Sequence, residues 1–83
     1  MTGKNILRDQ FLEVVENQLK TNDPPETKIT LERLIEEGFK ERVAKELIAT
    51  CVATEMYEVI SNNTPFDEAH YIENLHRLPE LPE

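Results

Sequence analysis

Glu55 is the residue whose position most strongly suggests chemistry, because its carboxylate interrupts an apolar stripe of helical spacing. With about 100° of rotation per residue along 41–61, Glu55 falls on one side among Ala44, Leu47, Ile48, Cys51, Val52 and Val59. An unpaired carboxylate in such a face is costly, so it needs a partner, a ligand or water.

The lengths of two expected helices suggest a structural partner for Glu55. If residues 24–37 and 41–61 pack as an antiparallel hairpin, Glu55 lies level with residues 23–27. There the free amides and the positive dipole end of a helix accept a carboxylate. We therefore expect Glu55 to cap this helix or to be exposed where the longer helix extends past it, and a ligand-binding role is the alternative.

The two histidines are the other candidate ligands. Glu73 and His76 have the Glu-x-x-His spacing of carboxylate-bridged metal sites in helical bundles, but such sites use two of these motifs and the chain has one. Residues 67–70 spell Asp-Glu-Ala-His, a helicase box, yet the chain has no phosphate-binding glycine loop, so we interpret them as a helix start. We expect no cofactor; the alternative is a small-ligand or metal site using Glu55 with His70 or His76.

Nucleophilic catalysis is not expected. Cys51 is the single cysteine and lies on the apolar side of its helix, which is typical of a small core residue. The histidines form no evident pair with Cys51 or with a serine, and a core of this size leaves little room for a substrate pocket. The sequence predicts a protein that is not an enzyme.

Four helices must position these side chains, at about residues 5–20, 24–37, 41–61 and 67–78. Asp23 is the expected N-cap of the second helix, and Gly38 is expected to close it in a left-handed conformation. Either Thr64 or Asp67 caps the fourth helix, with Phe66 as its apolar staple.

The fold class that follows is a small all-α four-helix domain spanning residues 1–83. Few residues separate the second and third helices, so we expect them to form an antiparallel hairpin on which the first and fourth helices pack. Proline in residues 78–83 prevents a further helical turn, so an extended tail is expected.

Charge and hydropathy exclude several classes of partner. The chain has 17 acidic and 9 basic residues and a net charge of -8, a surface that repels nucleic acid and anionic lipid. No apolar run has the length of a membrane span, and the N-terminal residues lack the apolar core of a secretory signal. We expect a cytoplasmic protein that binds neither nucleic acid nor membranes.

Apolar residues outside the main stripes indicate more apolar surface than two packed helices need; they are Leu12, Leu19, Met56, Tyr57 and Ile60. Either the other helices cover them, or they form an oligomer face or a partner groove. The preferred hypothesis is a non-enzymatic protein interaction or structural module that binds a protein partner or self-associates as a homo-oligomer.

The pattern from residue 33 onward resembles a group of short uncharacterised bacterial proteins. The residues that carry it are Arg33-Leu34, Glu37-Gly38-Phe39, Ala44, Ile48, Glu55, Asn63-Thr64-Pro65-Phe66-Asp67, Tyr71, Leu75 and Leu78-Pro79-Glu80-Leu81-Pro82. The resemblance covers roughly residues 22–82 and leaves out the first helix. Lys40 departs from it, because a Ser-like helix cap is expected there. The group has no activity to transfer, so the resemblance implies only the fold and a bacterial cytosolic setting.

Overall fold

The computed structural model describes residues 6–82, with side chains from residue 8 onward, and has four α-helices and no strand in this range. The helices are α1 (Ile6–Thr21), α2 (Pro25–Glu36), α3 (Glu41–Asn62) and α4 (Glu68–Arg77). The predicted all-helical class is confirmed, and each end lies within one residue of its predicted position.

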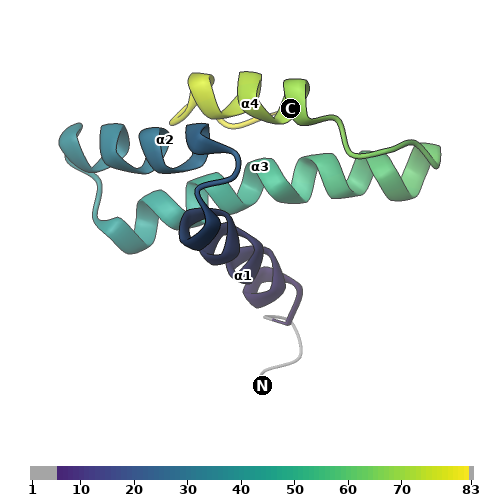
Figure 1. The fold of residues 1–83 in the computed structure, drawn as a ribbon, viewed down its shortest axis with the longest axis horizontal. Helices are drawn as coiled ribbons and strands as arrows, with labels where there is room; N and C mark the ends of the chain where they lie inside the picture. Colours follow the sequence, from purple (N-terminus) through teal and green to yellow (C-terminus); the bar gives the residue numbers. More distant parts are fainter. Residues whose placement is uncertain (1–5, 83) are drawn as a thin grey trace.

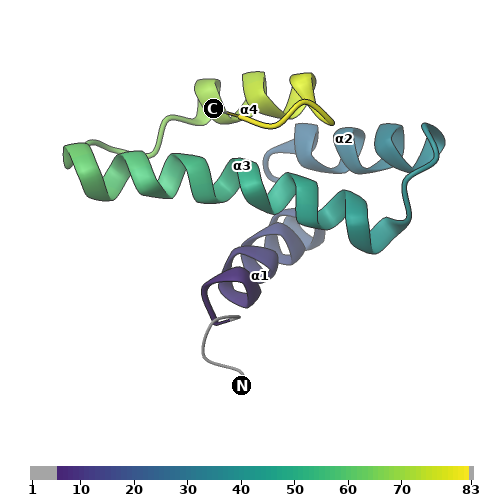
Figure 2. The same cartoon turned by 180° about the vertical axis from the view of Figure 1, so that it is seen from behind.

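The longest helix, α3, forms the axis on which the other three pack. Figure 1 shows α1 crossing one side of α3, with α2 over its N-terminal part and α4 over its middle on the other side, so that the last turns of α3 extend past α4. The view from behind shows the same arrangement, with the residues after α4 folding back along that helix (Figure 2). Because α2 also contacts α1 and α4, the N-terminal half of α3 is the more completely enclosed half.

The core is formed by apolar side chains from all four helices and the turn after α4: Val15, Leu31, Leu34, Ala44, Ile48, Ala49, Cys51, Val52, Tyr71, Leu75 and Leu78. Cys51 is completely buried, as its place in the stripe predicts. Val14 of α1 is 38% exposed although it follows Phe11 by three residues, a spacing that places both on one side of the helix. The reason is that α1 packs against its neighbours mainly through Val15 and the part-buried Phe11, Leu12 and Leu19.

Gly38 ends α2 as predicted. Its φ of 111° lies in the region that side chains rarely adopt. The amide of Gly38 donates to the carbonyl of Ile35, and the amide of Phe39 donates to that of Leu34, both at 3.0 Å. These two bonds form a Schellman motif, which satisfies carbonyls at the end of α2 and turns the chain toward α3.

The predicted N-cap of α2 is wrong by one residue. Pro24 occupies the cap position and Pro25 begins the helix, without a hydrogen bond from a capping side chain. Asp23 instead closes the preceding helix, because its backbone amide donates to the carbonyl of Gln18 at 3.0 Å after Asn22 turns the chain with a φ of 56°. The second proline supplies the fixed φ that suits a first helical position.

Candidate functional site

Glu55 is buried and its carboxylate pairs with the imidazole of His70. The residue is 1% exposed, and its Oε2 contacts Nδ1 of His70, whose side chain is 48% exposed. The expectation that Glu55 caps the start of α2 or is exposed is therefore wrong. The reason is that α4, not the start of α2, lies beside this part of α3 (Figure 1).

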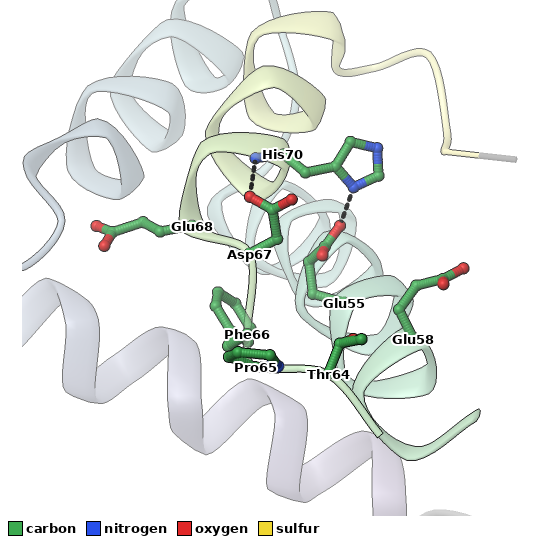
Figure 3. Close-up of a pocket in the computed structure, with 8 residues that line it drawn as sticks. All are labelled: Glu55, Glu58, Thr64, Pro65, Phe66, Asp67, Glu68 and His70. Carbon is green, nitrogen blue, oxygen red and sulfur yellow. Dashed lines mark hydrogen bonds and ion pairs between the residues drawn. The ribbon is translucent and has the colours of Figure 1, made fainter. Parts of the chain in front are cut away.

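The start of α4 places the imidazole over Glu55. Asp67 is the N-cap, and one of its carboxylate oxygens accepts a 3.1 Å hydrogen bond from the backbone amide of His70. Phe66 packs edge-to-face on Tyr71 with ring centroids 5.6 Å apart. This is the expected staple across the cap. Figure 3 shows the result, with the His70 ring turned toward the carboxylate of α3.

An open hollow lies beside the pair. It is lined by Glu55, Glu58, Thr64, Pro65, Phe66, Asp67, Glu68 and His70, from the end of α3, the connecting loop and the first turn of α4 (Figure 3). Carboxylates dominate its charge, with His70 as the one basic side chain of the lining. A carboxylate with an imidazole can hold or transfer a proton, but catalysis also requires a nucleophile or a bound substrate beside them.

Cys51 does not supply that nucleophile. Burial, together with the nearby charge of Glu55, raises the pKa of the Cys51 thiol to about 12. The thiol therefore stays protonated near neutral pH and has no solvent access. This environment fits a structural core cysteine.

The second histidine lies apart from Glu55. His76 is exposed near the end of α4 and faces away from the buried stripe of that helix. Of the two histidines proposed beside Glu55, the structure therefore places only His70 in contact with it. Within residues 6–82 there is no cluster of three or more His, Cys, Asp or Glu side chains arranged to hold a metal ion.

A second polar group joins three helices inside the fold. The Oε1 atom of Gln18 accepts hydrogen bonds from Thr27 and Tyr71, each at 2.7 Å, and so connects α1, α2 and α4. Burial raises the pKa of the Tyr71 hydroxyl to about 12. This group occupies the position near the start of α2 where Glu55 was expected.

The five residues proposed for an interface divide into two groups. Leu12, Leu19 and Met56 are part-buried against the core, whereas Tyr57 is 68% exposed and Ile60 is 78% exposed. The exposed pair lies on α3 beyond its crossing with α1. Next to it is an apolar groove lined by Arg8, Phe11, Leu12, Glu46, Ala49, Thr50 and Ala53.

Asn74 is a buried polar residue that sequence reasoning missed. It is 5% exposed, and it is the one buried side chain of the described region with a polar atom, Nδ2, that lacks a hydrogen-bond partner. The signal was present in the sequence, because Tyr71, Asn74, Leu75 and Leu78 repeat at three- and four-residue steps. An amide within an apolar stripe marks a position worth testing.

Comparisons with protein-family models, with curated proteins and with solved structures find no match to this chain. Among the residues described, no helix combines the length and the apolar character that crossing a membrane requires.

Proposed function

We propose that this protein is a non-enzymatic interaction module that self-associates through the exposed face of α3. The observation that carries the proposal is the exposure of Tyr57 and Ile60, at 68% and 78%, on the half of α3 that α1 leaves open. Large apolar side chains gathered on one surface mark interaction sites more often than isolated ones do. The proposed scaffold also includes an antiparallel α2–α3 hairpin and an extended Pro-containing tail after α4. We propose that the module acts in a bacterial cytoplasm.

The shape of this face supports a second copy of the chain as the partner. Ala53, Tyr57 and Ile60 fall within an arc of about 60° on the helix. If two α3 helices pack antiparallel about a two-fold axis level with Glu55, Tyr57 of each copy faces Ala53 of the other and Ile60 faces Thr50. Large side chains then meet small ones, in the self-complementary arrangement that a two-fold interface requires.

Sedimentation velocity tests this proposal with two matched isoleucines. We expect the wild-type protein to sediment as a dimer at high concentration and the Ile60→Asp variant as a monomer. Ile29 is the control, because it is 61% exposed on α2, so Ile29→Asp adds the same charge away from the proposed face. A wild-type monomer at about millimolar concentration, or equal effects of the two variants, would overturn the proposal.

A small-ligand or metal-binding function is a second candidate. It is favoured by the contact of Glu55 with His70 at an open hollow that Glu58 also lines. Carboxylate oxygen and imidazole nitrogen are both ligands of Zn²⁺. We expect a Zn²⁺ titration followed by calorimetry to show binding that His70→Ala abolishes and His76→Ala leaves unchanged; no heat of binding with the wild-type protein rejects this candidate.

A further inference from the structure

The apolar groove between α1 and α3 contains a four-residue hole of the kind that receives a side chain from a facing helix. Its α3 side consists of Glu46, Ala49, Thr50 and Ala53, at positions i, i+3, i+4 and i+7. Four residues with this spacing form the hole in knobs-into-holes packing. The alanine and threonine side chains are small, so a larger side chain can enter from outside.

The N-terminal half of α1 forms the other wall of the groove. Phe11 and Leu12 line it and are only part-buried, although both pack against the core. Arg8 closes one end through an ion pair with Glu46. The Thr50 hydroxyl donates to the carbonyl of Leu47 in its own helix. The hydrogen-bonding groups of the lining are therefore largely satisfied, and an apolar side chain is the occupant that suits the groove.

Ile60 is the exposed side chain whose position matches this hole. It is the most exposed large apolar residue of the described region, on turns of α3 that extend past α1 (Figure 1). At about 100° of rotation per residue, the hole and the pair Tyr57 and Ile60 are centred on the same direction around α3. In an antiparallel pair about an axis level with Glu55, residue 60 of one copy lies level with residue 50 of the other. Ile60 then lies over the hole of the second copy.

The charges along this contact are also complementary. The last turn of α3 has no basic residue, so no side chain there offsets the negative end of the helix dipole. In the same antiparallel pair, Glu46 lies level with residue 64, just past the end of the other α3. Arg8, whose side chain is 54% exposed beside Glu46, can therefore approach the carbonyls at that end. This complementarity favours a second copy of the chain over an unrelated apolar ligand.

We propose that Ile60 of each copy inserts into the groove between α1 and α3 of the other copy, and that Arg8 binds the carbonyl end of the other α3. The two contacts are related by the two-fold axis, so each dimer contains both. The inference rests on the self-association proposed above. It adds to it that α1 forms part of the interface, through Arg8, Phe11 and Leu12.

A charge exchange followed by sedimentation velocity tests the pairing of residue 50 with residue 60. Thr50→Lys and Ile60→Asp each place a charge in an apolar contact, so we expect each variant alone to be a monomer. An equimolar mixture should form a heterodimer. The new lysine of one chain then faces the new aspartate of the other, and the second contact keeps the native Ile60 and Thr50. Thr21→Lys is the control, because it adds the same charge at the exposed end of α1, outside the groove; it should dimerise alone and should not recruit Ile60→Asp.

Arg8→Gln tests the contribution of α1. We expect the dissociation constant of the dimer to increase about threefold, because a cation is lost from the end of a helix dipole. Arg77→Gln is the matched control, because Arg77 is also an exposed arginine with an acidic partner and lies on α4, away from the groove. Its dissociation constant should stay closer to that of the wild type.

The outcomes separate this inference from the self-association on which it rests. A dimeric wild type and a monomeric Ile60→Asp support self-association through α3. If the mixture of Thr50→Lys and Ile60→Asp nevertheless stays monomeric, or Arg8→Gln and Arg77→Gln dimerise equally well, the groove contact is overturned and self-association stands. A monomeric wild type overturns both.

Discussion

The contact between Glu55 and His70 shows how one buried carboxylate is accommodated in this fold. Glu55 is 1% exposed, so water does not solvate its carboxylate. The energetic cost of burying this group is offset by the imidazole of His70, which α4 places beside it. His70 is half-exposed, which lowers the free energy that the pair contributes. The pair thus attaches the first turn of α4 to α3 and keeps the carboxylate next to an open hollow.

Removing the imidazole should destabilise the protein more than neutralising the carboxylate. His70→Ala leaves a buried charge without its partner, and we expect a loss of about 2 kcal/mol in the free energy of unfolding. Glu55→Gln keeps the shape and removes the charge, at a cost of about 1 kcal/mol.

Urea unfolding followed by circular dichroism measures both losses. The exposed His76→Ala is the control and should change stability by less than about 0.5 kcal/mol. The double variant combines Glu55→Gln with His70→Ala. If its free energy of unfolding is no lower than that of His70→Ala alone, the result would support the pairing. Additive losses would show that the two side chains do not interact.

Alkaline pH should unfold this protein through Cys51 and Tyr71. Both groups have a pKa of about 12 when folded, raised from 9.0 and 10.0, so the folded state holds these protons more tightly than the unfolded state. Their contribution to stability is complete below pH 9 and is lost as the pH rises through 12.

The Tyr71→Phe variant tests the tyrosine part of this expectation. We expect the melting temperature of the variant to fall less steeply with pH between about 10 and 12. Tyr57→Phe, a change at a 68% exposed tyrosine, is the control and should follow the wild type. If Tyr71→Phe and the wild type have the same slope, the Tyr71 hydroxyl does not contribute to alkaline unfolding.

At the scale of single elements, the start of α3 lacks a side-chain cap. Lys40 occupies its N-cap with φ and ψ of -66° and 150° and makes no hydrogen bond through its side chain. By contrast, Asp67 caps α4 through its carboxylate. A lysine also places a positive charge at the positive end of the helix dipole.

Replacing this lysine by a capping residue should stabilise the protein. Lys40→Ser supplies an acceptor for the free amides of the first turn, and we expect a gain of about 1 kcal/mol in the free energy of unfolding. Lys28→Ser, at the exposed fourth residue of α2, removes the same charge near a helix start without forming a cap and should bring no gain. Comparing the melting temperatures of the two variants distinguishes the effect of the new cap from the effect of removing a positive charge.

At the scale of the whole molecule, net charge opposes the proposed dimer. Each copy carries a charge of -8, and the two centres would lie at a separation of roughly twice the radius of gyration of 12.4 Å. This separation is below the Debye length of about 30 Å at 10 mM salt and above that of about 8 Å at 150 mM. Repulsion is therefore screened only at the higher salt concentration.

Salt should consequently strengthen self-association. We expect the dimer dissociation constant from sedimentation equilibrium to decrease about tenfold or more between 10 and 150 mM sodium chloride. Ile60→Asp should stay monomeric at both concentrations. A dissociation constant that increases with salt would indicate that ion pairs, not apolar contact, hold the copies together.

The elements of this fold could be predicted from sequence because the signals that define them are local. Gly38, Phe66 and Asp67 act on their own turn of helix, and the apolar stripe around Cys51 requires only helical periodicity. The shift from Asp23 to Pro24 at the start of α2 was missed because the end of α1 competes for the same residues. Rules that consider one helix at a time do not decide whether a residue between two helices ends the first or caps the second.

What the sequence by itself determined is four amphipathic helices, their ends to within one residue and the place of a carboxylate within the apolar stripe of the third. Only the tertiary structure decided that His70, fifteen residues away, is the partner of Glu55 and that Gln18, Thr27 and Tyr71 meet instead at the start of α2. It also decided which apolar residues stay exposed on α3. The physical reason is that helix formation follows from side chains within a few turns, whereas these contacts depend on where α1 and α4 cross α3.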